Sequence, residues 1–229
     1  MRAVLAVWRD LAPGVRHFEF VLPEVNQFPF VPGQFVTLTE AIEGKEISRA
    51  YSICSAPDGN RFELCLNLVE GGRLSPRLFA LGQGESIECK GPNGFFVLRN
   101  PPSDSIMIAA GTGIAPFRGI LKHALQRYPE LGFTLLFGTR RQDTILYRDE
   151  WQELETQHDN FRFWPSLSRA GADWRGRRGH VQEHLDEALE GRTDVDVYIC
   201  GLKAMVDDVR QRLKAKGFDR KRIIYEKYD

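Results

Sequence analysis

Apolar and polar residues alternate along several short stretches in the first hundred residues. The alternation is clearest at residues 15–22 (VRHFEFVL), 34–39 (QFVTLT) and 62–69 (FELCLNLV). A period of two is typical of strands with one buried face. Gly, Pro and Asn residues punctuate these stretches, for example at 32–33, 58–60 and 91–94, and they predict turns. Short strands in series predict an all-β antiparallel barrel, because a closed barrel leaves no strand edge open.

Two segments interrupt this pattern, and each predicts a different local structure. Residues 43–47 (EGKEI) are expected to form a flexible loop. Ser75 and Pro76 precede RLFAL. Ser is a good helix N-cap and Pro suits the first helical position, so a short helix capped by Ser75 is expected.

The pattern changes after residue 104. Strand-like runs at 105–110, 133–137, 161–164, 196–200 and 223–225 are separated by helical stretches at 116–128, 148–158, 181–189 and 202–216. Strands that alternate with helices predict an α/β doubly wound parallel sheet. Residues 100–104 (NPPSD) are expected to form a linker. The predicted organisation is a β-barrel at 1–99 followed by a nucleotide-binding α/β domain at 105–229.

Charge and composition narrow the function classes. Lys and Arg number 31, as do Asp and Glu, so the formal net charge is zero; this argues against a basic nucleic-acid binder. No run approaches the roughly 18 apolar residues of a membrane span, and the N-terminal segment lacks the features of a signal peptide. A cytoplasmic protein is expected. The four cysteines and five histidines are scattered, without metal-ligand or iron–sulfur spacing, so we predict no metal.

The first candidate for chemistry is Arg49-Ala50-Tyr51-Ser52. A strand here would place Arg49 and Tyr51 on one face, with Ala50 and Ser52 on the other. An Arg can grip a diphosphate through its planar fork, a Tyr ring can stack on a flat heterocycle, and a Ser hydroxyl can donate to a ring nitrogen. Alone, the four residues equally suit an ordinary half-exposed strand.

Two glycine-containing segments are candidates for phosphate binding. Gly71-Gly72 precedes the expected short helix, whose N-terminus would favour an anion; a plain strand–turn–helix junction is the alternative. Gly111-Thr112-Gly113 follows the first strand of the second domain and opens a helix. In a doubly wound sheet the dinucleotide pyrophosphate binds there. The segment is not G-x-G-x-x-G, because Pro116 stands near the place of the third glycine.

Basic residues follow two strands of the second domain. The strand 133–137 leads into Gly138-Thr139-Arg140-Arg141, with no acid before Asp143, and the next strand leads into Ser168-Arg169. Arg175, Arg177 and Arg178 come soon afterwards. Positive charge at these ends favours the 2′-phosphate of NADP, whereas an acid is typical of NAD sites. For each Arg, the alternative is a solvated surface charge.

Taken together, these motifs resemble those of a known enzyme family. RAYS, GGRLSPRL, GPNGFF, GTGIAPF, SLSR and CGLKAM occur in that order from residue 49 onward. This set resembles the FAD-dependent ferredoxin/flavodoxin–NADP⁺ reductase family, in particular its bacterial branch. The resemblance implies an enzyme that moves electrons between NADP(H) and a one-electron carrier, ferredoxin or flavodoxin, by hydride transfer to flavin N5. A monomer is the default expectation.

The resemblance also implies residue roles on the flavin side. Arg49 and Ser75, with the backbone at Arg73 and Leu74, would bind the FAD diphosphate. Tyr51, next to Ala50 in the same motif, would stack against the isoalloxazine, and Ser52 would hydrogen-bond near flavin N5. The adenosine side would be lined by Asn67, Leu68 and Val69.

Further roles are implied for the second domain. Thr112, between Gly111 and Gly113, would touch both the flavin and the nicotinamide nucleotide, and Cys200 with Gly201 would border the nicotinamide. The 2′-phosphate ligands would be Arg140, Ser168, Arg169 and Arg177, with Arg175 and Arg178 as alternatives to Arg177. Glu226 and Tyr228, followed by Asp229, resemble an ending in which an aromatic ring lies against the flavin, and Tyr225 competes with Tyr228 for that role. Glu226 and Ser52 would together stabilise the change of protonation at flavin N5.

Other functions remain open at this point. The chain could be an NAD(P)H-dependent reductase component of an oxygenase system, or a free-flavin reductase. A flavin-bearing subunit without a nicotinamide reaction is a further alternative, although such subunits usually carry a cysteine cluster that is absent here. A non-catalytic binding module is the last.

Overall fold

The computed structural model describes residues 1–228, which form two compact units. The barrel unit comprises Met1–Leu98 together with Ala115–His123, and the sheet unit comprises Arg99–Ile114 and the chain from Ala124 onward. Each unit is described by itself. The domain bounds expected from the sequence, 1–99 and 105–229, stay a prediction.

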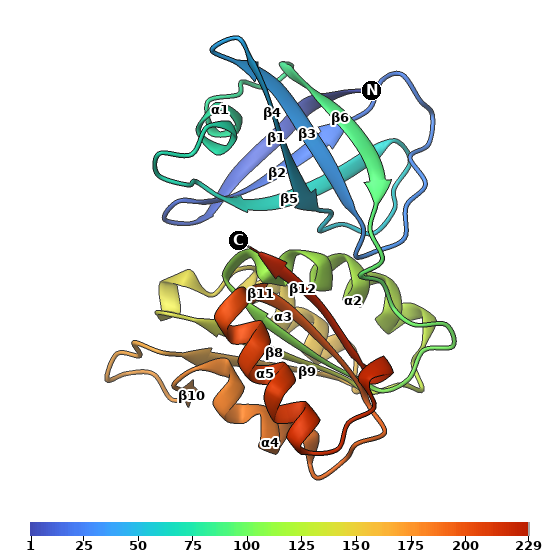
Figure 1. Ribbon diagram of the computed structural model, residues 1–229, viewed down its shortest axis with the longest axis vertical. Helices are drawn as coiled ribbons and strands as arrows, with labels where there is room; N and C mark the ends of the chain where they lie inside the picture. Colours follow the sequence, from blue (N-terminus) through green and yellow to red (C-terminus); the bar gives the residue numbers. More distant parts are fainter. Residues whose placement is uncertain (229) are drawn as a thin grey trace. The chain divides into compact units, whose positions relative to one another are not determined.

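The barrel unit is built on six antiparallel strands (Figure 1). They are β1 (Arg2–Ala12), β2 (Val15–Val21), β3 (Phe35–Ile42), β4 (Lys45–Ser52), β5 (Arg61–Asn67) and β6 (Ser86–Asn93), in the order β4-β3-β6-β1-β2-β5. Just beyond β4, Ile53 bridges to Leu64 of the opposite edge strand, β5. The sheet therefore closes on itself, and the predicted all-β antiparallel fold is confirmed.

Alternating apolar residues fill the barrel interior. Phe18 and Phe20 of β2 and Phe62 of β5 are buried in one cluster, and the rings of Phe20 and Phe62 stack with centroids 5.4 Å apart. The helix α1 (Leu74–Phe79) adds Leu74 and Leu78 to this cluster. Burial of such aromatic and aliphatic side chains is the main force that closes the barrel.

Four local predictions in this unit were wrong. The expected loop at 43–47 is a two-residue turn, Glu43-Gly44, with φ of 53° and 72°, and Lys45 already begins β4. Residues 91–93 belong to β6 and not to a turn. The β5 strand ends at Asn67, before residues 68–69. The N-cap of α1 is Arg73, not Ser75; the Ser75 Oγ instead accepts a hydrogen bond from the Val69 N–H at 3.0 Å.

The sheet unit contains six parallel strands. They are β7 (Ser105–Ala110), β8 (Phe133–Thr139), β9 (Phe161–Leu167), β10 (Arg177–Arg178), β11 (Asp196–Leu202) and β12 (Ile223–Tyr228), in the order β10-β9-β8-β7-β11-β12. All neighbouring pairs run parallel. The strand order reverses between β7 and β11, and ligands of doubly wound sheets bind at the carboxyl ends of the strands at such a point.

The helices of this half of the chain are α2 (Ala115–Arg127), α3 (Arg148–Gln157), α4 (Leu185–Leu189) and α5 (Lys203–Ala215). Short 3₁₀ helices η1 (Gly111–Ile114), η2 (Gln142–Thr144), η3 (Val181–His184) and η4 (Arg220–Arg222) complete the set. The first nine residues of α2 count with the barrel unit. The stretch expected to be one helix at 181–189 is η3 followed by α4, and Leu202 ends β11 instead of starting α5.

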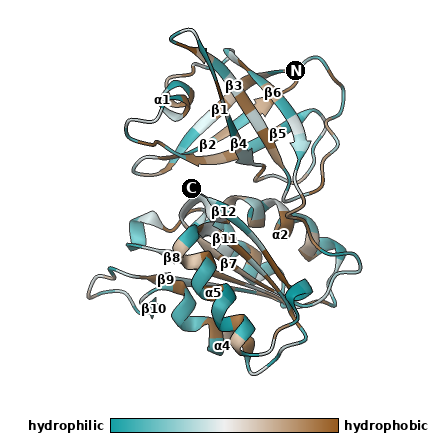
Figure 2. Ribbon diagram, viewed as in Figure 1, coloured by the Kyte–Doolittle hydropathy of each residue, from teal (hydrophilic) through white to brown (hydrophobic). Residues whose placement is uncertain are grey.

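Both faces of the parallel sheet are covered. Ile106 and Ile108 of β7 share a cluster with Val206 of α5 and Leu185 of α4. On the other face, Phe161 and Phe163 of β9 contact Trp151 of α3, with ring centroids 6.3 and 5.9 Å away. Figure 2 shows hydrophobic positions on the central strands and hydrophilic positions on the outside of α5. The predicted doubly wound parallel sheet is confirmed.

Candidate functional site

The end of β4 carries the predicted flavin contacts. Strand register places Tyr51 opposite Val36 and Ser52 opposite Phe35. Ser52 is buried, Tyr51 is half-buried against the barrel core, and Arg49 is exposed. Burial raises the pKa of Tyr51 to about 12, and the charge of Arg49 offsets only part of this effect. The Tyr51 phenol is therefore neutral at physiological pH.

The helix α1 brings the predicted diphosphate ligands to the same side of the barrel, because it packs against β3 and β4. No side chain caps its first turn, so early N–H groups remain available to an anion. The Ser75 Oγ accepts from the Val69 N–H, which leaves the hydroxyl proton able to donate. Leu68 and Val69 are 44% and 56% exposed, as apolar contacts for an adenine ring would be. These features fit FAD.

Gly111, Thr112 and Gly113 form η1, directly after β7. Gly111 is exposed, with φ of 55°, in the left-handed region that favours glycine. A Cβ added to Gly113 would collide with the carbonyl group of Cys200. Glycine at 113 is therefore what lets this turn lie against the carboxyl end of β11.

Cys200 and Gly201 lie at that end of β11 and are buried. In the β11–β12 register Cys200 pairs with Glu226, and Leu202 pairs with Tyr228. Burial raises the pKa of the Cys200 thiol well above its ordinary value, and the nearby Glu226 adds to this, while a hydrogen bond with Tyr228 opposes it. The thiol is therefore protonated at neutral pH. The Tyr225 ring instead lies 3.7 Å from the Arg210 guanidinium of α5.

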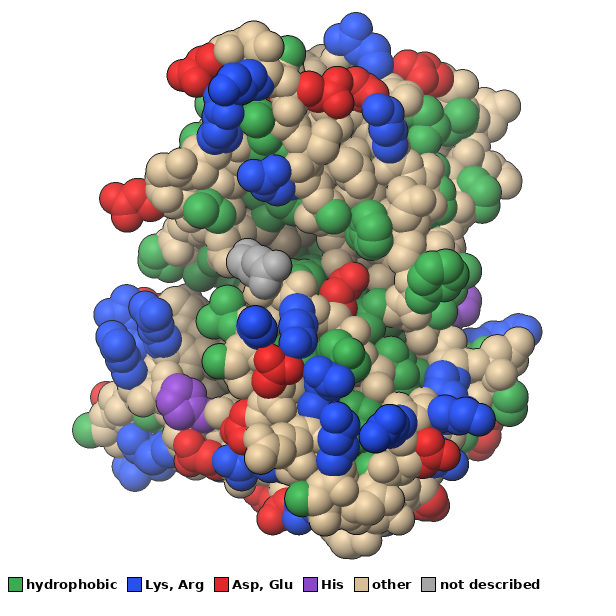
Figure 3. Space-filling model, viewed as in Figure 1, with side chains coloured by type: hydrophobic (Ala, Val, Ile, Leu, Met, Phe, Trp, Pro, Cys, Tyr) green, Lys and Arg blue, Asp and Glu red, His purple; other side chains and the backbone are tan. Residues whose placement is uncertain are grey.

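The structure brings Arg140, Ser168 and Arg169 together at the carboxyl ends of β8 and β9. The Ser168 N–H donates to the Thr139 carbonyl at 3.0 Å, and the Arg169 N–H donates to the Arg140 carbonyl at 2.8 Å. All three side chains are exposed. Figure 3 shows Lys and Arg side chains gathered on the left of the sheet unit in that view.

Arg177 is engaged with other groups. Its guanidinium lies 3.6 Å from the Trp164 ring centroid and 2.6 Å from a carboxylate oxygen of Glu187. Arg178 donates to the carbonyls of Gly171 and Trp174, so it holds the loop between β9 and β10. Arg175 is exposed. A 2′-phosphate role for Arg177 would thus have to compete with its ion pair to Glu187.

Comparison with known proteins agrees with this arrangement. Residues 2–98 match the oxidoreductase FAD-binding domain, and residues 107–211 match the oxidoreductase NAD-binding domain. The chain is 40% identical to ferredoxin–NADP reductase B of Sorangium cellulosum, over 99% of this chain and 97% of that protein. It belongs to the ferredoxin–NADP reductase family. Members of this family are FAD-dependent NAD(P)H oxidoreductases, and so is this chain.

Two other proteins are similar over nearly the whole of this chain. A ferredoxin–NADP⁺ reductase from Neisseria gonorrhoeae, solved with FAD and NADP, is 26% identical, with a TM-score of 0.83 over 99% of this chain and 98% of that one. The electron transfer component of toluate 1,2-dioxygenase from Pseudomonas putida is 26% identical over 99% of this chain but only 67% of its own length. None of the helices in residues 1–228 has the length and apolar character that a membrane crossing needs.

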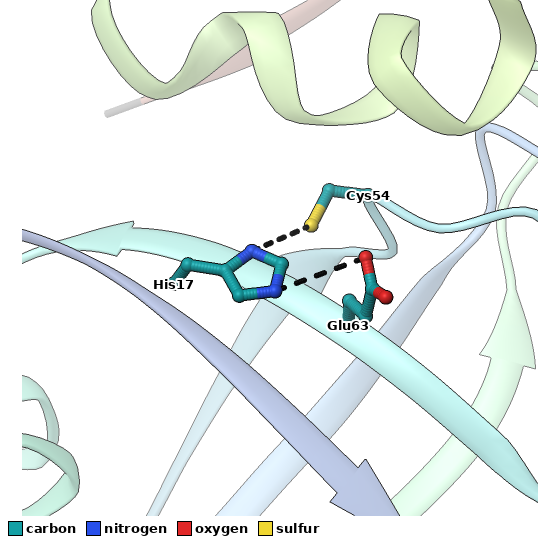
Figure 4. Close-up of side chains that lie close together, drawn as sticks. All are labelled: His17, Cys54 and Glu63. Carbon is teal, nitrogen blue, oxygen red and sulfur yellow. Dashed lines mark hydrogen bonds and ion pairs between the residues drawn. The ribbon is translucent and has the colours of Figure 1, made fainter. Parts of the chain in front are cut away.

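One cluster escaped the sequence reasoning. His17 of β2, Cys54 after β4 and Glu63 of β5 converge inside the barrel unit (Figure 4). The His17 Nδ1 lies 3.9 Å from the Cys54 Sγ, and its Nε2 lies 3.8 Å from a Glu63 oxygen. The three residues are far apart in the sequence, so no local spacing could have indicated them.

This cluster does not suit a single metal ion. The two ring nitrogens of His17 face different partners, whereas an imidazole offers an ion only one of them. The Arg118 guanidinium also binds the Glu63 carboxylate, and a second positive charge there would be repelled. The cluster is better described as a polar network in which the buried His17 and Arg118 both contact the half-buried Glu63.

Proposed function

We propose that this chain transfers electrons between NADP(H) and a one-electron carrier protein of the ferredoxin or flavodoxin type, as a cytoplasmic monomer. The observation that carries the choice of NADP is the group of Arg140, Ser168 and Arg169 at adjacent strand ends. NAD-binding sheets commonly place an acid there, while residues 138–142 of this chain contain none. In Asp143, the next acid, the Oδ1 lies 3.6 Å from the Nε of Arg141.

Residues of the barrel unit would hold the flavin. Arg49, Ser75 and the backbone at Arg73 and Leu74 supply donors for the diphosphate, and Asn67, Leu68 and Val69 line the adenosine. Tyr51 offers its ring to the isoalloxazine, next to Ala50. Ser52 offers a hydroxyl that can donate to a ring nitrogen.

When bound, FAD supplies the chemistry, because it takes a hydride from a nicotinamide and can release electrons singly. The protein supplies orientation and proton control. Gly111, Thr112 and Gly113 would seat the pyrophosphate of NADP, and Cys200 with Gly201 would form a small uncharged wall for the nicotinamide. The neutral Tyr51 phenol and Cys200 thiol would add no negative charge of their own beside the reacting rings. Glu226 and Ser52 would hold the proton that the flavin gains.

The C-terminal aromatic role is assigned to Tyr228. Tyr225 is engaged with Arg210, whereas Tyr228 hydrogen-bonds with Cys200. That an aromatic ring of the C-terminus lies on the flavin stays a prediction. Asp229, which follows Tyr228, lies outside the described residues.

Coenzyme choice is tested by the substitution Arg169→Ala. Loss of a charge-assisted hydrogen bond to the 2′-phosphate costs about 1.5–3 kcal/mol, or about 10–100-fold in NADPH efficiency. Flavin reduction by NADH should hardly change. Stopped-flow reduction with each coenzyme measures both.

Arg162→Ala is the matched control, because Arg162 lies near the start of β9, the strand whose carboxyl end leads into Arg169, and donates to the Asp159 carbonyl. It should leave both rates unchanged. If wild-type protein prefers NADH, or if Arg169→Ala weakens NADH and NADPH equally, the assignment to NADP is wrong.

The hydroxyl of Ser52 gives a second test. Ser52→Val should lower the limiting rate of flavin reduction at least about tenfold, less than the roughly 10²–10⁴-fold that a general acid or base contributes, while FAD stays bound. Ser52→Thr, which keeps the hydroxyl, should recover most of the rate. An unchanged rate in Ser52→Val would remove Ser52 from the mechanism.

One specific observation favours a second candidate. The chain matches 67% of the toluate dioxygenase component, so its two units could equally serve as the flavin and nicotinamide part of an oxygenase reductase. Turnover of NADPH with ferredoxin, flavodoxin and free flavin separates the alternatives. Fast turnover with free flavin alone would favour a flavin reductase over both.

A further inference from the structure

The beginning of helix α2 packs against the segment that follows β4. The same part of the helix also reaches the chain after β6, where Phe117 meets Phe96 edge-on, with ring centroids 5.6 Å apart. At Gly119 the helix backbone lies so close to Ser55 that an added Cβ would collide with the Ser55 carbonyl oxygen. All four residues belong to the barrel unit. Helix and segment are therefore in direct backbone contact.

Arg118, next to this contact, is a buried cation. Its side chain is 5% exposed, and it donates to the Cys54 carbonyl at 2.9 Å and to the Glu63 carboxylate. A guanidinium is stable in such a place only when hydrogen-bonded and charge-balanced. Both bonds come from one terminal nitrogen, Nη1, whose two N–H groups serve the two acceptors at once, so Arg118 fixes their relative positions.

The segment held in this way continues directly from the predicted flavin contacts. The Ile53 N–H donates to the Gln34 carbonyl at 2.9 Å, and the Cys54 N–H donates to the Glu63 carbonyl at 2.8 Å. The Glu63 N–H in turn donates to the Ser55 Oγ at 3.2 Å. Together with the bond from Arg118 to the Cys54 carbonyl, these hydrogen bonds hold the segment to Gln34, to β5 and to helix α2. Ser52 and Tyr51, one and two residues before Ile53, inherit that fixed position.

We propose that Arg118 is a positioning residue for flavin reduction. It fixes the 53–55 segment through Cys54 and Glu63, and Gly119 permits the close approach that this needs. Arg118 acts on the flavin only through the placement of Tyr51 and Ser52. The inference rests on the proposed function, in which those two residues contact FAD. An error of about 1 Å in such a contact can lower a rate about a hundredfold.

The test compares Arg118→Met, Arg118→Lys and Gly119→Ala with the control Arg16→Met. Arg16 is also a largely buried Arg of the barrel unit that binds one carboxylate, of Asp10, and one backbone carbonyl, of Phe79. Its side-chain hydrogen bonds go to these two groups and, among residues 1–228, none goes to the 53–55 segment. Each protein is loaded with FAD, and flavin content, the visible spectrum, the melting temperature and stopped-flow reduction by NADPH are measured.

In Arg118→Met the limiting reduction rate should fall at least about tenfold, with unchanged half-saturation by NADPH and a shifted flavin spectrum. Arg118→Lys keeps the charge and should recover the rate to within a few-fold. Gly119→Ala should reproduce the spectral shift and the slow reduction although Arg118 is intact. Arg16→Met should lose melting temperature but keep the wild-type spectrum and rate.

The wild-type protein decides the proposed function, since it must bind FAD and be reduced by NADPH. Given that, wild-type rates in folded Arg118→Met and Gly119→Ala would overturn the positioning role. Equal slowing in Arg16→Met would also overturn it, because the effect would then be general destabilisation. If Arg118→Met does not fold, Gly119→Ala still decides: a normal spectrum and a wild-type reduction rate in that variant would refute the proposal.

Discussion

Gly113 lies with its Cα against the carbonyl of Cys200. From the sequence, the glycines of this turn are expected to make room for a pyrophosphate. The structure adds a second reason for Gly113, which is backbone contact between η1 and the end of β11. A side chain there would separate the two elements whether or not a nucleotide is bound.

Gly113→Ala should therefore destabilise the protein by about 1–3 kcal/mol, the usual cost of overpacking. It should also weaken binding of NADP. Gly171→Ala is the control in the same unit, because a Cβ there meets no atom within 4 Å. Urea unfolding measures the first effect and nucleotide titration the second. Equal stability of the two variants would contradict this account.

The places of the candidate residues in the fold were predictable where a short motif carried them, while their roles stay predictions. Tyr51, Ser52 and the Gly111–Gly113 turn lie where strand ends and a helix start place them. Arg177 shows the limit: its type and position suggested a phosphate ligand, but only the fold reveals the ion pair with Glu187 and the contact with Trp164. The His17–Cys54–Glu63 cluster depends on strand pairing across the barrel, which no local pattern contains.

Among the elements, strands with regular alternation or continuous apolar runs were predicted, and the others were missed. In β6 the inward residues Ile87 and Cys89 alternate with charged ones, but Gly91 and Pro92 follow and suggested a turn. In β1 the pattern weakens because Val7 and Trp8 are 38% and 40% exposed. The two-residue β10 is too short for any periodic signal.

The start of β11 is held by a buried acid. Asp196 has a side chain that is 1% exposed, and its Oδ1 accepts from Arg99 at 2.8 Å and from Arg222 at 3.0 Å. Arg99 leads into β7 and Arg222 precedes β12, so one carboxylate ties together three neighbouring strands. Its other oxygen has no hydrogen-bond partner in the part of the chain that the structure describes.

Asp196→Asn should lower the free energy of unfolding by about 2–3 kcal/mol, somewhat less than a fully buried pair because both arginines are partly exposed. Asp194→Asn is the control two residues away. It removes an ion pair to Arg192 from an aspartate that is 70% exposed, so the change should stay within about 1 kcal/mol. Denaturant unfolding of both variants makes the comparison. A loss in Asp196→Asn no larger than in Asp194→Asn would show that the buried tie contributes little.

At the scale of the whole molecule, a fall in pH should destabilise the sheet unit more than the barrel unit. The pKa of Asp104 is held below its ordinary value because hydrogen bonds from the Gly132 N–H and Arg192 outweigh its burial. Arg177 lowers the pKa of Glu187, and Lys227 lowers that of Asp207. These three carboxyl groups all belong to the sheet unit. Each stabilises the fold above its unfolded pKa, and that stability is lost as the pH falls through the lower folded pKa.

We therefore expect the sheet unit to lose thermal stability faster than the barrel unit below pH 4.5, the ordinary value for Glu187. Tryptophan fluorescence reports mainly the sheet unit, through Trp151, Trp164 and Trp174, and release of FAD fluorescence reports the barrel. The midpoint temperature followed by tryptophan fluorescence should fall further than the one followed by FAD fluorescence when the pH is lowered from about 6 to about 3.5, just below the ordinary pKa of an aspartate. Asp104→Asn should reduce that fall. Parallel shifts of the two midpoints would contradict the prediction.

Helix α2 decides where the barrel unit can be excised from this enzyme. A cut near residue 100 would leave the excised barrel without Phe117, Arg118 and Ile120, so Phe96 would gain solvent on one side and Glu63 would lose its buried cation. Chimeras that exchange flavin modules between reductases should therefore carry residues 115–123 along with the strands, as a non-contiguous part of the same graft.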